Sequence, residues 1–346
     1  MSIKAAQFTI LFLSTFLLSG FLTWPVRKLA IYVGALDQPD GDRKKQSTPV
    51  PYFGGIAISS SILIISITAI FFGANSSLNI KIALTVLVPA AILGLLGLID
   101  DLKTLPPKPR LAIQTLVGSS VAIYLIDSGT IGSPFNNQVF DTVITAFWIV
   151  GICNAVNFFD NLDGAASGST GAIFLGIFII AFLEGQEMVA ALSIVAAGAT
   201  FGFLLWNKSP AKIYMGDAGS LFLGVLIGVL TIRLDSQITP EWKSLLLPVL
   251  LMGIPLLDTS VAVLSRISRG VSPLTGGRDH LSHRLVRAGL SRRKAAVVLW
   301  LASGVCTLFA LGVYLYPDTF GSLLVVTFMS FWFLGLVLFL RTPSHD

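Results

Sequence analysis

Long apolar runs recur along almost the whole chain and constrain its fold more than any other feature. A helix of about 20 apolar residues crosses the hydrocarbon core of a bilayer, and each run is long enough to do so. Only 12% of the residues are charged, about half the share in a typical soluble protein, and 54% are hydrophobic. The sequence therefore predicts an all-α polytopic integral membrane protein, with 1–346 as a single transmembrane domain. The expected eleven spans are 6–27, 52–73, 81–99, 111–127, 140–157, 166–184, 188–206, 218–234, 243–264, 295–316 and 320–340.

Basic residues lie mostly on one side of these predicted spans. Of the 23 Lys and Arg residues, only Lys4, Lys81, Arg233 and Lys243 fall on the other side. Loops rich in Lys and Arg remain in the cytoplasm, so we expect the N-terminus outside and the C-terminus inside. The first run lacks the small-residue exit of a cleavable signal and is interpreted as a true span. The expected location is the cytoplasmic (inner) membrane.

A polar string, Asn154-Ala-Val-Asn157-Phe-Phe-Asp160-Asn-Leu-Asp163-Gly164, follows directly from an apolar run. Amides and carboxylates at the end of a membrane helix are costly and usually mark a working site. Asn154, Asn157 and Asp160 are three residues apart, so they share one face if the helix continues, with Asp163 a turn further on. The alternative is a simple turn, which explains Gly164 but not the polar face before it.

Asp100 and Asp101 end the third predicted span and are followed by Lys103, Lys108 and Arg110. An ordinary boundary at the membrane interface is the alternative reading. Two adjacent carboxylates repel each other, however, and need a cation or a shared proton. Neighbouring helical side chains also diverge by about 100°, so the two residues are expected to serve different partners.

Asp217 lies in Tyr214-Met-Gly-Asp-Ala-Gly-Ser220, at the start of the eighth predicted span. One reading is a helix N-cap, in which the carboxylate accepts backbone N–H groups. A helix N-terminus flanked by glycines also binds phosphate, and a carboxylate there attracts a metal ion that bridges to phosphate. Both readings remain open.

A loop with two histidines and several arginines precedes the tenth predicted span. Arg278, His280 and His283 lie close together in it. A basic face on anionic lipid suits the run 292–294 but does not require two imidazoles beside arginines. The cluster therefore indicates an anionic substrate held between cations and a metal.

Five carboxylates are expected at the cytoplasmic ends of the helices. Hard oxygen ligands, without cysteine or histidine at zinc spacing, favour Mg²⁺, with Mn²⁺ as a substitute. Mg²⁺ with carboxylates and cations is typical of phosphoryl transfer. A site at the membrane surface implies one soluble and one lipid substrate, and nothing indicates nucleic acid.

Five motifs, in this order, resemble those of the polyprenyl-phosphate N-acetylhexosamine-1-phosphate transferases (glycosyltransferase family 4). The resemblance covers nearly the whole chain and is nearest to the WecA/TagO-like branch, which is related to MraY. Any one motif alone is weak, whereas five in order are highly specific. The motifs are Asp37-Gln-Pro-Asp40 with Arg43-Lys44-Lys45 to Gly55, Asp100-Asp101 with Lys108 and Gln114, Asn154 to Gly164, Met215 to Ser220, and His280-Leu-Ser-His283.

The resemblance implies transfer of GlcNAc 1-phosphate from UDP-GlcNAc to undecaprenyl phosphate, with release of UMP, as the first membrane step of cell-wall or surface glycan synthesis. It implies that Asp100 is the catalytic base, with Asp101 in support, and that Asp217 and Asp101 hold the metal. It also suggests a homodimer in contact with membrane lipids. The implied substrate-binding residues are Lys45, Lys108, Asn157, Asp160, Asn161, Asp163, Asn207, Tyr214, Arg278, His280 and His283.

Ser282 departs from the His-x-His-His pattern common in the family, which leaves the preferred UDP-sugar open. The adjacent histidines usual in MraY are missing, so an amino sugar such as GlcNAc is favoured over the alternative, MurNAc-pentapeptide. A secondary transporter is the rival from another class. Transporters place ionisable groups near the bilayer midplane, often in repeated halves. Here only Asp258 lies well inside a span, and we expect it to pair with a hydroxyl or with Arg266.

Overall fold

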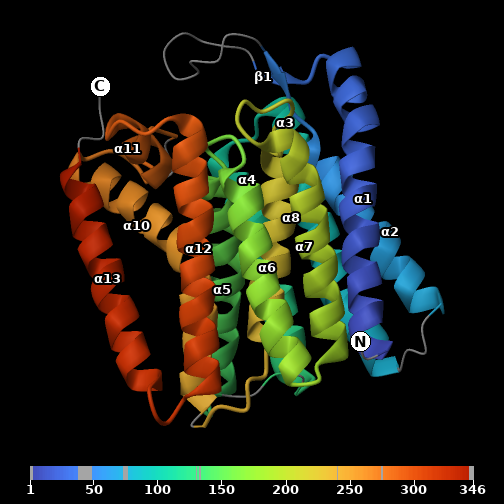
Figure 1. Cartoon of the computed structure of the whole chain (residues 1–346), viewed down its shortest axis with the longest axis vertical. Helices are drawn as coiled ribbons and strands as arrows, with labels where there is room; N and C mark the ends of the chain where they lie inside the picture. Colours follow the sequence, from blue (N-terminus) through green and yellow to red (C-terminus); the bar gives the residue numbers. More distant parts are fainter. Residues whose placement is uncertain are drawn as a thin grey trace.

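A computed structural model of the chain describes residues 3–37, 49–72, 77–129, 131, 134–239, 241–273 and 276–342. It is a bundle of long helices that run roughly along one common axis (Figure 1). The all-α prediction is confirmed, and the strands found among the described residues form one two-residue antiparallel pair, β1 (Leu36–Asp37) and β2 (Val50–Pro51). The long helices are α1 (Ile3–Tyr32), α2 (Gly54–Phe72), α3 (Ser77–Lys103), α4 (Pro107–Asp127), α5 (Gln138–Phe159), α6 (Ala165–Leu183), α7 (Glu187–Asn207), α8 (Gly216–Ile232), α12 (Arg292–Leu315) and α13 (Gly321–Arg341).

Burial divides the bundle into central and peripheral helices. Most residues of α6, α7 and α8 are buried, whereas α1, α4 and α13 expose large apolar side chains such as Phe21, Leu116 and Leu323. Such wide apolar exposure is unfavourable in water and suits lipid. The chain is therefore a polytopic membrane protein, as the apolar runs predict.

The number of spans is less uniform than the eleven apolar runs suggest. Within the described residues, nine helices are long and apolar enough to cross a bilayer, and one bent pair brings the total to ten. The eighth run forms α8, which has 17 residues and falls just short of this length. Every predicted run nevertheless coincides with a helix or with the bent pair.

The segment 243–264 is not the single helix that its apolar composition suggests. A short 3-10 helix, η1 (Glu241–Leu245), leads into α9 (Leu246–Leu251), and α10 (Gly253–Ser268) follows at an angle of 74°. Pro255 has no N–H to bond the carbonyl of Leu251, which explains why the helix breaks at Met252. The bend turns α10 across the bundle toward α5 and α13 (Figure 1).

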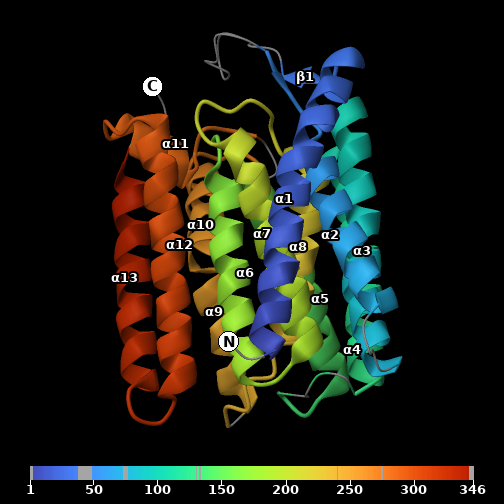
Figure 2. The same cartoon turned by 45° about the vertical axis from the view of Figure 1, so that its right-hand side comes forward.

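The two termini lie at opposite ends of the bundle, as Figures 1 and 2 show. The C-terminus, the strand pair and the short helix α11 (Leu281–Arg287) share one end. The polar motifs follow or precede helices at this same end. At this end α3 packs closely on α8, since a Cβ added at Gly97 would lie only 2.2 Å from the carbonyl oxygen of Asp217.

Candidate active site

An arginine joins two of the predicted carboxylates. Nη1 of Arg110, in the first turn of α4, donates to Oδ2 of Asp100 in α3 and, at 2.8 Å, to Oδ2 of Asp217 in α8. The backbone N–H of Leu105 also donates to Asp100, at 2.5 Å. The cation expected beside the adjacent Asp100 and Asp101 therefore contacts Asp100 and, in place of Asp101, the distant Asp217, and it links three helices. In the sequence, Arg110 is only one of three basic residues that follow Asp101, and no role is predicted for it.

Asp101 faces a different partner from Asp100, as the divergence of adjacent helical side chains predicts. Its two carboxylate oxygens accept the backbone N–H groups of Asp217 at 2.8 Å and Ala218 at 3.1 Å. Asp101 therefore caps the N-terminus of α8, where a negative charge is favoured by the helix dipole. One of the two open readings makes Asp217 the cap of this helix, but the capping carboxylate comes from α3, and Asp217 faces Arg110.

Asn157 completes the group around Asp217. Its Nδ2 donates to Oδ1 of Asp217 at 2.7 Å and to the Ser220 hydroxyl at 2.9 Å. Asn154, one turn earlier, donates instead to Gln114 at 2.7 Å. Of the predicted polar face, Asn154 thus binds α4 and Asn157 binds α8. Of these two side chains, Asn157 is the one that reaches a carboxylate.

The predicted polar face ends earlier than expected, because α5 stops at Phe159. Asp160 caps the helix with a non-helical backbone, φ −80° and ψ 59°. Burial, together with the nearby Asp101 and Asp163 carboxylates, raises the pKa of Asp160 to about 7. A carboxyl group with such a pKa responds readily to a bound cation, since a cation nearby favours its charged form.

The turn after Asp160 is anchored from two other helices. Gly164 has φ +75°, a conformation that favours glycine, as the turn reading predicts. Its N–H donates to Oδ1 of Asn207 in α7, and its carbonyl accepts the indole N–H of Trp300 in α12 at 2.8 Å. Asn207 also binds Ser167 and the Ile213 carbonyl, so this buried side chain is engaged within the protein rather than directed to a substrate.

Asp163 keeps one carboxylate oxygen without a hydrogen bond. Oδ2 accepts the N–H of Ala211 at 3.2 Å, whereas the buried Oδ1 has no partner. Such orphaned acceptors are rare in folded proteins.

The ring of Tyr214 lies 6.2 Å from that of Tyr52, and burial raises the pKa of both phenols. The phenols therefore stay neutral, able to donate or accept hydrogen bonds.

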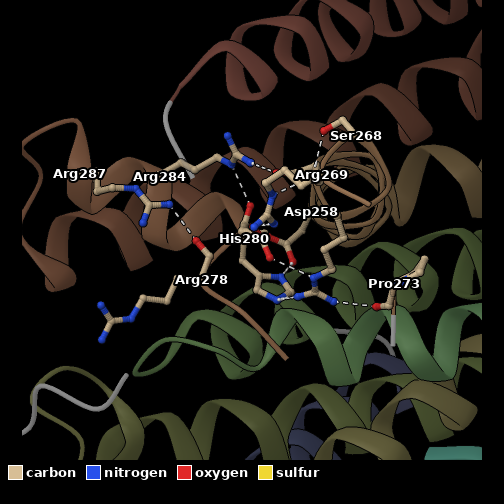
Figure 3. A network of polar contacts seen from close by, with 11 residues as sticks. Asp258, Ser268, Arg269, Pro273, Arg278, His280, Arg284 and Arg287 are labelled. Carbon is tan, nitrogen blue, oxygen red and sulfur yellow. Dashed lines mark hydrogen bonds and ion pairs between the residues drawn. The ribbon is translucent and has the colours of Figure 1, made fainter. Parts of the chain in front are cut away.

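The histidine loop rests on a buried charged network (Figure 3). Nδ1 of His280 lies 2.7 Å from Oδ2 of Asp258, and its Nε2 lies 3.2 Å from Nη2 of Arg266. Since arginine only donates, Nε2 is the acceptor and Nδ1 carries the proton that Asp258 accepts. Both nitrogens of this imidazole, which is 5% exposed, are thus engaged within the protein. Asp258 pairs with His280 and the Leu281 N–H rather than with a hydroxyl or Arg266.

Two arginines extend this network to the ends of α10 and α13. Arg266 donates to Asp279 at 3.0 Å and to the Pro273 carbonyl at 2.8 Å. Arg284, which is fully buried, donates to Ser265 and to the carbonyl of Phe339, near the C-terminus of α13. The loop is therefore fastened to the bundle by charged groups, as Figure 3 shows.

Ser282 and His283 are neighbours in α11, and Ser282 contacts the turn after α5. Burial, followed by the effect of His280, lowers the pKa of His283 to about 4, so its imidazole is neutral near pH 7 and not the cation that sequence reasoning considered. The Ser282 hydroxyl donates to Oδ1 of Asn161, whose Nδ2 donates to the Phe158 carbonyl at 2.7 Å. The residue that departs from the family pattern thus connects α11 to the turn after α5.

The remaining predicted residues are less closely tied to the carboxylates. Lys108 is exposed in the first turn of α4, and Arg278 is half-buried, with its carbonyl bound by Arg287 at 2.8 Å. Lys45 lies outside the described residues. The structure therefore brings Asp100, Asp101, Asp217 and Asn157 together. His280 and Asn207 hold neighbouring loops in place through hydrogen bonds within the protein.

The carboxylates suit a hard cation whose coordination shell is completed by oxygens of a substrate. No three His, Cys, Asp or Glu side chains gather as a metal cluster within the residues that the structure describes. Mg²⁺, however, is commonly held by one or two carboxylates together with substrate phosphates. The Asp217 side chain is 30% exposed and that of Asp100 6%, so Asp217 is the more accessible of the two carboxylates. The donor set fits Mg²⁺ in this substrate-assisted form.

Comparison with known proteins relates this arrangement to a family. The family model for glycosyl transferase family 4 matches residues 83–235, which include Asp100, Asp217 and Arg110. A Bacillus subtilis protein named as a probable undecaprenyl-phosphate N-acetylglucosaminyl 1-phosphate transferase is 32% identical over 317 residues, 89% of this chain and 85% of its own length.

Two other relatives carry related names. A decaprenyl-phosphate N-acetylglucosaminephosphotransferase of Mycolicibacterium smegmatis is 32% identical over 323 residues, 85% of this chain and 79% of its own. A phospho-N-acetylmuramoyl-pentapeptide-transferase of Streptococcus pneumoniae is 30% identical over 240 residues, 66% of this chain and 69% of its own. With motifs, fold and extended identity in agreement, the chain belongs to glycosyl transferase family 4.

Proposed function

We propose that this chain transfers N-acetylglucosamine 1-phosphate from UDP-GlcNAc to a polyprenyl phosphate such as undecaprenyl phosphate. The names of the Bacillus and Mycolicibacterium relatives support the sugar and the polyprenyl acceptor. One observation carries the chemistry: a single guanidinium, that of Arg110, holds Asp100 and Asp217 together at one end of the bundle. The product would enter cell-wall or surface glycan synthesis.

The proposed reaction exchanges one phosphorus–oxygen bond for another. A phosphate oxygen of the polyprenyl phosphate bonds to the phosphorus that carries the sugar, and the bond from that phosphorus to UMP breaks. Asp100 would receive the proton of the acceptor phosphate or orient that phosphate. Arg110 lies where negative charge accumulates, and a fixed cation there lowers the barrier without reorganising.

Mg²⁺, replaceable by Mn²⁺, is part of this proposal. Asp217 would hold the metal ion. The Asp101 carboxylate caps α8 and lies beside Asp217, whose backbone N–H it accepts. The metal would neutralise charge on the diphosphate. Asn157 orients Asp217 through a hydrogen bond of 2.7 Å, as outer partners of metal ligands commonly do.

UDP-MurNAc-pentapeptide is the second candidate donor, because the Streptococcus relative is named as a phospho-N-acetylmuramoyl-pentapeptide-transferase. It matches 66% of this chain, less than the 89% of the Bacillus relative. Ser282 adds a reason to favour the smaller donor, because this buried side chain is bound to Asn161 and leaves no histidine at its position.

The test uses the purified full-length chain in detergent with undecaprenyl phosphate and Mg²⁺. Radiolabelled UDP-GlcNAc should yield a labelled lipid and UMP, at least tenfold faster than UDP-MurNAc-pentapeptide. Asp217→Asn should lower turnover by about 10²-fold, the scale for one preorganised electrostatic contact. Transfer that survives EDTA, or an active Asp217→Asn enzyme, contradicts the metal assignment. A preference for the pentapeptide donor contradicts the sugar assignment.

A further inference from the structure

A cavity lined by both apolar and charged side chains lies at the end of the bundle opposite the candidate active site. It has a volume of about 420 Å³ and lies where α5 begins and where α8 passes into the segment 233–245. Because α8 has 17 residues, a rise of 1.5 Å per residue places this cavity about 25 Å from Asp217. Its volume lies within the range of small-molecule sites, roughly 300–1,000 Å³.

Arg233, directly after α8, brings a buried positive charge to this cavity. The residue is 6% exposed and lines the space. Its Nη2 donates to the neutral hydroxyl of Thr85 at 2.8 Å, and its buried Nε has no partner. None of the carboxylates that the structure describes forms an ion pair with it. A buried charge without a counter-charge is strongly destabilising, so a partner from outside the chain is expected.

Two acidic residues line the same cavity. Asp141 is 3% exposed and accepts the backbone N–H groups of Phe135 and Asn137, both at 3.3 Å. Asp235 is exposed and binds Gln237. The exposed carboxylate of Asp235 retains acceptor capacity, because each oxygen has two lone pairs, and Asp141 adds a buried negative charge. The cavity therefore presents a guanidinium and two carboxylates that do not neutralise one another by direct pairing.

We propose that this cavity binds the zwitterionic head group of an aminophospholipid. The phosphate would meet Arg233, and the primary ammonium would donate to Asp141 and Asp235. The ends of membrane-spanning helices lie at the level of lipid head groups, so the cavity is placed to receive one. Guanidinium and phosphate match in geometry and charge.

Other lipid classes match the cavity less well. An anionic head group satisfies Arg233 but leaves two carboxylates beside added negative charge, and such repulsion opposes binding. A quaternary ammonium carries no N–H to donate to Asp141. The lining therefore discriminates among lipids that share the same phosphate.

The test measures lipid retention by native mass spectrometry of the full-length chain in detergent. Phosphatidylethanolamine, phosphatidylglycerol and phosphatidylcholine with identical acyl chains are added separately. Phosphatidylethanolamine should be retained about tenfold more than either of the others, and Arg233→Gln or Asp141→Asn should each abolish this preference. The matched control is Lys81→Gln, which removes an exposed charge from α3 at the same end and should change nothing.

Further variants and a soluble probe keep the result decisive. Arg233→Lys keeps the charge and should retain part of the preference even if Arg233→Gln does not fold. Ile144→Trp adds bulk at the cavity lining and should also reduce retention. Equal retention of the three lipids, or an unchanged preference in Asp141→Asn, overturns the proposal. The proposal is also overturned if inorganic phosphate raises the unfolding temperature as much as phosphatidylethanolamine does, because the site then binds a free anion.

Discussion

Arg110 is the residue whose replacement tests the candidate active site most directly. Its Nη1 bonds both Asp100 and Asp217, and the three side chains come from α4, α3 and α8. Arg110→Gln keeps hydrogen-bonding capacity but removes the charge, which leaves two neighbouring carboxylates without their shared cation. One of them is then expected to take up a proton, because like charges at this range disfavour double ionisation.

The expected loss of turnover is estimated from the hydrogen bonds of Arg110 to Asp100 and Asp217, which the substitution weakens or removes. A hydrogen bond to a charged group contributes about 1.5–3 kcal/mol, and each 1.4 kcal/mol is about tenfold in rate. Losing one such preorganised contact in the transition state costs about 10²–10³ in kcat. We expect Arg110→Gln to lower kcat by about 10²-fold, with a smaller change in KM for the sugar nucleotide. Arg110→Lys should be intermediate, because a single ammonium lacks the rigid fork of arginine.

The assay is steady-state transfer of radiolabelled GlcNAc 1-phosphate to undecaprenyl phosphate, with size-exclusion chromatography to verify folding. Lys103→Gln is the matched control, since it removes an exposed charge from the end of α3 and should leave kcat near the wild-type value. The reasoning fails if Arg110→Gln retains wild-type kcat, or if Lys103→Gln loses as much activity as Arg110→Gln.

Four other outcomes are expected. Asp101→Ala should lower the unfolding temperature, since the lost cap is worth about 1 kcal/mol, and unchanged stability would contradict the capping role. The folded-state pKa of His283, about 4, lies below the unfolded value of 6.5, so unfolding takes up a proton between these values; stability should fall as pH drops from 6.5 to 4, and His283→Gln should flatten that slope in chemical denaturation. Ser282→His should lower the unfolding temperature, because an imidazole replaces a buried hydroxyl bonded to Asn161, and a changed ranking of UDP-sugars in transfer assays would identify position 282 as a specificity determinant. In a background without cysteines, Lys294→Cys should react with impermeant maleimide only from inside the cell and Gln138→Cys only from outside, and the reverse pattern would invert the topology.

The apolar runs and the spacing of polar residues were enough to predict the helical membrane fold and most of the carboxylates. Both are local properties: twenty apolar residues must form a helix in lipid wherever they occur, because no water satisfies their backbone groups. The turn at Gly164 followed from equally local chemistry. The break at Met252 was less evident, because the apolar composition continues through it and only Pro255 signals it.

Partners between distant segments were decided by tertiary packing alone. Asp101 caps a helix whose first residues lie 116 positions away, and the close approach at Gly97 makes that possible. His280 has both nitrogens engaged by Asp258 and Arg266 because the bend before α10 brings that helix beneath the loop. A sequence states which groups are charged, but which of them share a hydrogen bond depends on how helices pack, and only the folded chain determines that.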